Sequence, residues 1–137
     1  MKAIMKKSQS VFEKIKKVDQ NGNEYWSARD LAIALDYKDF RNFVQVIEKA
    51  AESCKTSGNQ PLDHFVDVTE MINLPKGAKR QVLSYHLSRY ACYLIVQNAD
   101  PAKEPVAIGQ TYFAIQTRLQ ELTQLEAYNS LNSENEK

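Results

Sequence analysis

The sequence has little cysteine, glycine or proline and no long apolar run, and each shortage excludes a class of protein. Its 137 residues include two cysteines, four glycines and four prolines. Cys54 and Cys92 lie in segments with helical apolar spacing, so we expect buried, reduced thiols rather than a disulfide framework. The isolated glycines cannot form the clustered loop that cradles phosphate groups. The longest apolar stretch, around residues 91–96, is far too short to cross a bilayer.

Size and composition are those of one ordinary globular domain. The chain is 43% hydrophobic and 26% charged, which excludes a disordered or fibrous protein. The basic N-terminus is not followed by the apolar segment of a secretory signal. We therefore expect a cytoplasmic protein with no membrane partner.

Charge is nearly balanced over the whole chain but not along it. The net charge is +1, so no strong overall field attracts the protein to DNA. Residues 1–17 carry six lysines and one glutamate, a net +5, whereas residues 126–137 carry three glutamates and one lysine, a net −2. A basic segment can contact phosphate groups, although a solvated helix face is the more usual explanation of such a pattern.

Apolar spacing and turn residues predict an α+β domain that is mostly helical. We expect helices at about residues 10–17, 27–35, 40–55, 90–97 and 104–128, and strands at 24–26, 63–68 and 81–87. Three of the helices are expected to be capped by Ser10, Ser27 and Ser88. The last two strands form a hairpin with a basic loop at 73–80. The expected fold is winged-helix-like, with a small antiparallel sheet, a long C-terminal helix and a polar, disordered tail at 129–137.

Two neighbouring helices, at 27–35 and 40–55, have the outline of a helix-turn-helix. The exposed side chains around the start of the second helix can contact base edges or phosphates, and the hairpin can serve as a wing. The candidate DNA-binding residues are Lys38, Arg41, Asn42, Gln45 and Lys49 at the helix, and Lys76, Lys79 and Arg80 on the hairpin. Two amphipathic helices often show this outline without binding DNA, and Asp39, Glu48 and Glu52 weaken the attraction of the second helix for phosphate.

The last helix carries an apolar stripe at alternating spacings of four and three residues, which is a short heptad seam. Its members are Ile108, Tyr112, Ile115, Leu119 and Leu122. The stripe either packs on the core of its own domain or pairs with the same helix of a second chain. A homodimer is therefore among the expected partners.

Candidates for catalysis and metal binding are sparse. Cys54, His64, His86 and Cys92 are the plausible soft metal ligands, but no two of them have the spacing usual in structural zinc sites. The two histidines lie in expected strands, where a structural role is more usual. No G-x-S-x-G nucleophile elbow and no cysteine-protease signature is present. We therefore expect no enzyme, no metal and no cofactor.

Five segments of the chain are particular enough to indicate a family. They are Tyr25–Leu31 (YWSARDL), Phe40–Phe43 (FRNF), Asp63–Phe65 (DHF), Tyr85–Pro101 (YHLSRYACYLIVQNADP) and Gly109–Arg118 (GQTYFAIQTR). Together they closely resemble the DNA damage-inducible protein D family of bacteria over about residues 11–122. That family is similar to the N-terminal domain shared by phage antirepressors and baculovirus Bro proteins, a module generally assigned to DNA binding.

The resemblance implies a single Bro-N-like domain over residues 1–128. It also implies induction with the DNA-damage (SOS) response and a role in modulating recombinase filaments on single-stranded DNA. It carries over no catalytic residues. Members of the family usually continue well beyond this length, so the chain is either an N-terminal fragment or a short relative.

The leading hypothesis is a DNA-binding regulator of the damage response or of a phage-type control system, with single- or double-stranded DNA as its partner. The alternative is a module that binds a recombinase or repressor protein without touching DNA. It is indicated by the near-zero net charge and by the aromatic-rich run Tyr85–Tyr93. A third hypothesis, a nuclease, has no motif to support it.

Overall fold

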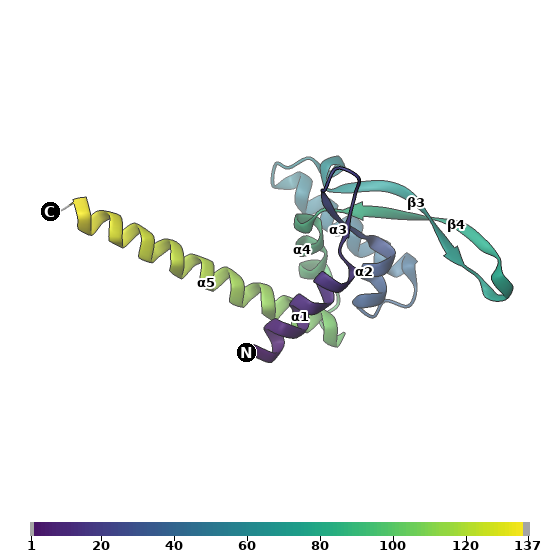
Figure 1. The fold of residues 1–137 in the computed structure, drawn as a ribbon, viewed down its shortest axis with the longest axis horizontal. Coiled ribbons are helices and arrows are strands. Elements are labelled where there is room, and N and C mark those ends of the chain that lie inside the picture. Colours follow the sequence, from purple (N-terminus) through teal and green to yellow (C-terminus); the bar gives the residue numbers. More distant parts are fainter. Residues whose placement is uncertain (1, 136–137) are drawn as a thin grey trace.

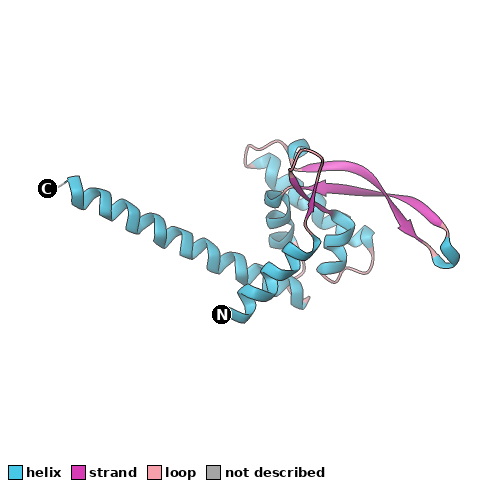
Figure 2. Ribbon diagram, in the orientation of Figure 1, coloured by secondary structure: helices cyan, strands magenta, loops and turns pink. Residues whose placement is uncertain are grey.

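The computed structural model describes residues 2–135, whose helices and strands are drawn in Figures 1 and 2. The helices are α1 (Lys2–Ile15), α2 (Ala28–Ala34), α3 (Phe40–Thr56), α4 (Arg89–Asn98) and α5 (Glu104–Asn135). The strands are β1 (Lys17–Val18), β2 (Glu24–Ser27), β3 (Phe65–Asn73) and β4 (Lys79–Leu87), and short 3-10 turns lie at Pro61–Asp63 and Pro75–Gly77. The expected α+β class, with a small antiparallel sheet and a long C-terminal helix, is confirmed.

Two elements project from the helical body on opposite sides (Figure 1). The β3–β4 hairpin extends on one side as a twisted two-stranded ribbon, and α5 leaves on the other as a single long helix. The helices α1 to α4 and the inner ends of the strands form the body between them (Figure 2). Within residues 2–135, no helix combines the length and the apolar character that crossing a membrane requires.

The sheet is antiparallel, with the strand order β1-β2-β4-β3. Trp26 of β2 and Phe65 of β3 both pair with Leu87 of β4, and all three side chains are buried. β3 and β4 remain paired out to Asn73 and Lys79, whereas β2 accompanies β4 only at its inner end. In the described part of the chain, the outer part of the ribbon therefore has no third strand beside it.

The core forms where α2, α3 and α4 pack against the inner end of the sheet. α3 buries Phe43, Val46, Ile47, Ala50 and Cys54, and α4 buries Ala91, Cys92, Ile95 and Val96. Trp26 is 1% exposed, and its Nε1 donates to the carbonyl oxygen of Phe12 over 3.0 Å, which ties α1 to the core. Both cysteines are buried free thiols, as predicted.

Hydroxyl side chains start two of the helices, as predicted. Ser27 Oγ accepts from the backbone N–H of Asp30, and Ser88 Oγ accepts from that of Ala91. Ser88 Oγ also lies 2.7 Å from His64 Nδ1, so the side chain that caps α4 holds the residue before β3 in place. This contact supports the structural role expected of His64.

The helix predicted at 10–17 begins earlier than its sequence suggests. α1 starts at Lys2, so Ser10 lies inside the helix and not at its N-cap. Residues 2–9 contain no glycine or proline and are mostly good helix formers, which allows the helix to extend past the serine.

Two further elements are longer than predicted. β3 runs from Phe65 to Asn73 rather than over 63–68, and the loop between the strands shrinks to 74–78 because Lys79 and Arg80 pair with β3. α5 continues beyond Tyr128 to Asn135, since no glycine or proline follows Gly109 to end it.

Candidate nucleic-acid interface

The outer end of the β3–β4 ribbon, residues 71–81, is strongly basic, and we call it the hairpin tip. It contains Lys76, Lys79 and Arg80 and no acidic residue, a net +3. All three cations are exposed. Within the described part of the chain, none of them forms an ion pair. The hairpin tip is also the part of the ribbon farthest from the helical body (Figure 1).

The turn at the hairpin tip is closed by its own backbone. The N–H of Leu74 donates to the carbonyl oxygen of Ala78 over 2.8 Å. Lys76 and Gly77 both adopt positive φ angles, 67° and 80°. Glycine suits this conformation, whereas a lysine there is strained by about 1–2 kcal/mol. The turn therefore presents its cations on a defined backbone rather than on a loose loop.

Two side chains from the body hold the middle of the ribbon. Ser27 Oγ donates to the Glu70 carboxylate, with oxygen distances of 2.8 and 2.9 Å. Arg29 Nε donates to the carbonyl oxygen of Leu83 over 2.9 Å, while its guanidinium lies 4.0 Å from the centre of the Phe40 ring. Arg29 therefore connects α2, the start of α3 and the ribbon.

Charges of both signs act on Arg29, which lies where the ribbon leaves the body. Burial lowers the pKa of the Arg29 guanidinium; the Glu70 carboxylate opposes this shift and the charge of Arg80 adds to it. The Glu70 carboxylate has the larger effect of the two charges on the pKa of Arg29, so Arg29 is compensated by Glu70 more than it is repelled by Arg80.

The outer face of α3 carries the predicted polar side chains but no net positive charge. Arg41, Asn42, Gln45 and Lys49 are all exposed there, as predicted. Glu48 and Glu52 are exposed on the same helix. The two cations of this helix face are therefore matched by two anions.

Arg41 is also engaged by the residue that caps its own helix. Its Nη2 lies 3.1 Å from Asp39 Oδ2, and Asp39 Oδ1 accepts from the backbone N–H of Arg41 over 2.9 Å. Hydrogen bonds from Arg41 lower the pKa of Asp39, and the same pairing raises the pKa of Arg41. Because both groups are exposed the pair is weak, but it still reduces the charge that Arg41 offers to a phosphate.

Lys38 lies in the turn between α2 and α3, beside several acidic groups. It lines an open hollow together with Asp36, Asp39 and Asp100, and with Lys103. Three carboxylates face two ammonium groups there, so this surface does not attract a polyanion. The structure thus divides the predicted residues into a basic hairpin tip and a charge-balanced surface around α3.

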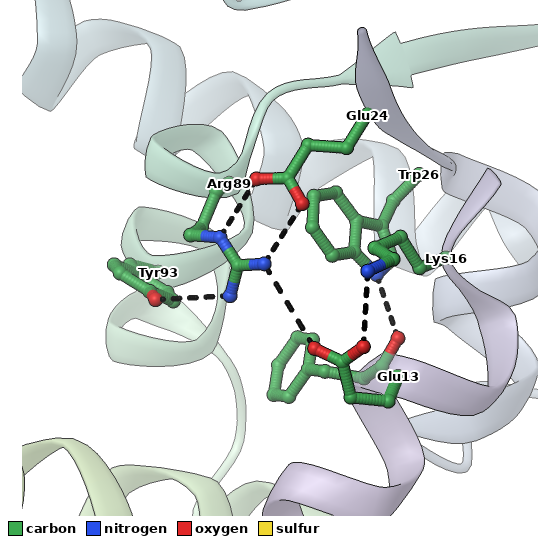
Figure 3. A network of polar contacts seen from close by, with 7 residues as sticks. Glu13, Lys16, Glu24, Trp26, Arg89 and Tyr93 are labelled. Atoms are coloured by element: carbon green, nitrogen blue, oxygen red, sulfur yellow. Dashed lines mark hydrogen bonds and ion pairs between the residues drawn. The ribbon is translucent and has the colours of Figure 1, made fainter. Parts of the chain in front are cut away.

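A polar network that the sequence did not indicate joins α1, β2 and α4 (Figure 3). Arg89 donates to both carboxylate oxygens of Glu24, over 2.9 and 2.8 Å, and its guanidinium lies 5.1 Å from the Trp26 ring. Its Nη2 is also 3.9 Å from Glu13 Oε1. The Arg89 hydrogen bond lowers the pKa of Glu24. This network holds α1, β2 and α4 together. Because carboxylates already match the charge of Arg89, its role is structural.

Two remaining candidates for catalysis or metal binding, His86 and Cys92, lie in surroundings typical of structural residues. His86 stacks on Tyr25, with ring centres 4.2 Å apart, and burial raises the pKa of the Cys92 thiol, which keeps it protonated and unreactive. In the residues that the structure describes, no three His, Cys, Asp or Glu side chains are grouped to hold a metal ion. A hollow of about 240 Å³ between α1, α2 and α5 is lined mainly by apolar side chains such as Val11, Leu35 and Ile108.

Comparison with known proteins assigns most of the chain to one family. Residues 14–114 match the family model described as BRO family, N-terminal domain. The chain is 50% identical over 123 residues to DNA damage-inducible protein D of Escherichia coli (strain K12), an alignment that covers 90% of this chain and 45% of the relative. The chain thus spans less than half the length of that relative. No solved structure matches it.

The matched region includes α2, α3, the whole ribbon, α4 and the first turns of α5. The resemblance seen in the five sequence segments is confirmed by both comparisons. The chain belongs to the BRO family, through the N-terminal domain that defines it.

Proposed function

We propose that this domain is a DNA-binding regulator of the bacterial DNA-damage response, and that the hairpin tip makes its principal DNA contact. The family and the name of the relative, DNA damage-inducible protein D, support the regulatory role. One observation carries the DNA contact: three exposed cations, none of which forms an ion pair within the described residues, stand at the end of the projecting ribbon. The proposed role is binding, without a chemical step.

The order of elements supports a winged-helix mode of binding. α2, a short turn, α3 and then a hairpin follow one another along the chain, as the helices and wing of such domains do. In this proposal, Lys76, Lys79 and Arg80 contact phosphates on either side of a groove that receives the ribbon. Met71 and Leu74 are exposed at the same tip and supply apolar groups that can contact bases in the minor groove.

The surface around α3 has a secondary role in this proposal. Its members Lys38, Arg41, Asn42, Gln45 and Lys49 can add contacts once the ribbon is bound. Because Glu48 and Glu52 accompany them, these contacts contribute orientation rather than attraction.

Fluorescence anisotropy with labelled single- and double-stranded oligonucleotides, at low and moderate salt, tests the proposal. We expect binding that weakens with salt, and at least about tenfold weaker binding when Lys79 and Arg80 are both changed to alanine. Lys55→Ala is the matched control, because Lys55 is an exposed cation at the other end of α3. It should bind as the native chain does.

Two outcomes would count against the proposal. If the Lys79→Ala, Arg80→Ala variant binds as the native chain does, the hairpin tip is not part of the DNA interface. Absence of binding to either oligonucleotide at micromolar protein and low salt would remove DNA as the partner of this domain. A preference for single strands would favour a filament modulator, and one for duplex would favour an operator-binding regulator.

A second candidate function is recognition of a recombinase or repressor protein, and the ribbon edge favours it. Leu83 is 74% exposed and Met71 is 60% exposed, and no strand among residues 2–135 lies along the outer edge of β3. Such an edge can pair with an extended segment of another protein. The aromatic run Tyr85–Tyr93 is less suitable than expected, because Tyr85, Tyr90 and Tyr93 are half-buried. Retention of purified recombinase or repressor on the immobilised domain without DNA would support this function.

We also propose that α5 is the contact between two copies in a homodimer. The predicted seam is divided in the structure. Ile108, Tyr112 and Ile115 are half-buried by their own domain, whereas Leu119 and Leu122 are exposed. The exposed part of α5 is thus the part that a second copy can cover.

A further inference from the structure

The two faces of the β3–β4 ribbon differ in what covers them. In an antiparallel pair of strands, directly paired residues lie on the same face, and successive pairs alternate between the two faces. On one face of the outer ribbon all six side chains are exposed: Thr69, Met71, Asn73, Lys79, Gln81 and Leu83. We call these six residues the open face.

The opposite face of the ribbon is held by the body. Glu70 lies on that face and accepts a hydrogen bond from Ser27 Oγ over 2.8 Å. Ser84 lies on the same face and is only 2% exposed. The open face instead continues the side of the sheet on which Phe65 and Leu87 are buried in the core. Within residues 2–135, no helix covers the outer part of this side (Figure 1).

The open face combines exposed apolar groups with side-chain amides, and none of its residues is acidic. Met71 pairs with Gln81 and Asn73 pairs with Lys79, so the apolar group and the cation each lie beside an amide. Leu83, the next large apolar side chain on this face, is 74% exposed. Exposed apolar groups that are surrounded by polar ones are typical of a binding surface. Asparagine and glutamine amides are among the groups that proteins use to recognise base edges.

We infer that the open face reads A·T base pairs in the minor groove of duplex DNA, with Asn73 and Gln81 as the residues that determine specificity. This inference rests on the proposed DNA-binding function and adds which groups of the DNA are recognised. Charge favours DNA as the occupant, because the hairpin tip, which includes most of this face, carries a net +3. A strand from a protein partner would pair with the edge of β3 and would leave the open face uncovered.

The chemistry of the minor-groove floor explains why A·T pairs suit this face. An A·T pair presents only acceptors there, adenine N3 and thymine O2, whereas a G·C pair adds the amino group of guanine. The amide N–H groups of Asn73 and Gln81 can donate to the acceptors of an A·T pair. A guanine amino group would instead face the apolar Met71 and Leu83 and lose the water that it binds in free DNA.

The minor groove must open to admit a two-stranded ribbon, and the apolar side chains of the open face supply the means. The groove is about 6 Å wide in B-form DNA, which is narrow for two strands. Apolar side chains that insert between base steps unstack them and bend the duplex away from the minor groove, which widens it. Met71 and Leu83 are exposed enough to insert in this way. Steps such as TA deform at low cost, which favours the same A·T-rich sequences.

Fluorescence anisotropy with three duplexes of equal length and identical flanks tests the inference. Their central base pairs are A·T, G·C or I·C, where inosine is guanine without its amino group. An I·C pair therefore resembles A·T in the minor groove and G·C in the major groove. The native chain should bind the A·T and I·C duplexes within about twofold of each other, and the G·C duplex at least about tenfold more weakly.

Changing both amides to alanine tests the residues that are assigned to the readout. Asn73→Ala with Gln81→Ala should reduce the preference for A·T over G·C to within about twofold. Because both residues are uncharged, the slope of log affinity against log salt should change by less than about 0.5. Gln60→Ala is the matched control, because Gln60 is an exposed amide in the loop before β3 whose side chain makes no capping hydrogen bond. It should keep the preference of the native chain.

The contrary outcomes separate this inference from the proposed function. Equal affinity for the A·T and G·C duplexes, or binding to single strands alone, would overturn the inference and leave the DNA-binding proposal standing. An I·C duplex that binds as weakly as the G·C duplex would overturn the assignment to the minor groove. A preference that survives in the double variant would overturn the assignment to Asn73 and Gln81. Absence of binding to every duplex and single strand would overturn both the inference and the proposed function.

Discussion

The surface around α3 and the hairpin tip contain the same kinds of residue, yet their electrostatics differ. α3 presents Arg41 and Lys49 together with Glu48 and Glu52, and Arg41 is paired with Asp39. The hairpin tip presents three exposed cations, and none of them forms an ion pair in the part of the chain that the structure describes. The comparison teaches that the number of cations on a surface matters less for binding a polyanion than the number left without a nearby anion.

Reversing the charge of two cations at each surface should produce the largest difference in DNA affinity between the hairpin tip and α3. Lys79→Glu with Arg80→Glu should weaken duplex binding by more than about a hundredfold, because two attractive contacts become repulsive. Arg41→Glu with Lys49→Glu should weaken it by less than about threefold. Anisotropy titrations of both variants measure the difference. Equal losses would show that α3 belongs to the contact as fully as the ribbon.

Arg29→Ala should loosen the ribbon without removing any charge from the hairpin tip. The substitution deletes the hydrogen bond to Leu83 and the contact with the Phe40 ring, so we expect a loss of about 1–2 kcal/mol in the free energy of unfolding. Thermal unfolding should shift downward by about 5 °C. Lys38→Ala, an exposed cation in the next turn, serves as control, and an equal shift in both variants would contradict the anchoring role of Arg29.

Neutralising the acidic residues of α3 should show how much they lower the DNA affinity of the domain. Glu48→Gln with Glu52→Gln gives this helix face a net positive charge while it keeps the size of both side chains. We expect a gain in DNA affinity of only about two- to threefold, because these residues act at a distance from the contact. A gain above about tenfold would instead place the α3 face directly on the phosphates.

The smallest effect is expected from releasing Arg41. Asp39→Ser removes the carboxylate that pairs with Arg41 and keeps a side-chain oxygen to cap α3. DNA affinity should change by less than about twofold. A larger gain in anisotropy measurements would mean that Arg41 contacts DNA when it is free to do so.

The body of this fold could be predicted from local patterns in the sequence. The apolar spacing of α3 places Phe43, Ile47 and Cys54 on one face, and these residues are buried as expected. Ser27 and Ser88 precede α2 and α4 as their caps. Each of these signals depends on residues within four positions of one another, which is the range over which helix geometry fixes contacts.

The remainder depended on contacts between distant residues. Arg89 and Glu24 are 65 positions apart, so their ion pair has no signature in the sequence. Asn73 and Lys79 pair with each other, although the sequence predicted a loop at 73–80. This pairing depends on the two strands together, so neither segment alone indicates it. The candidate DNA-binding residues, and the acidic residues that weaken the α3 surface, could be named from the sequence. The ion pair between Arg41 and Asp39 and the exposure of the three hairpin cations required the structure.

The salt dependence of duplex binding tests the central claim most directly. The slope of log affinity against log salt should be about 2–3 less steep when Lys76, Lys79 and Arg80 are all changed to alanine, because each phosphate contact contributes about 0.9. The triple variant Lys38→Ala, Arg41→Ala, Lys49→Ala, which removes the same number of cations around α3, should leave the slope within about 0.5 of the native value. A slope that falls with the α3 variant and stays unchanged with the hairpin variant would contradict the account and assign the phosphate contacts to α3.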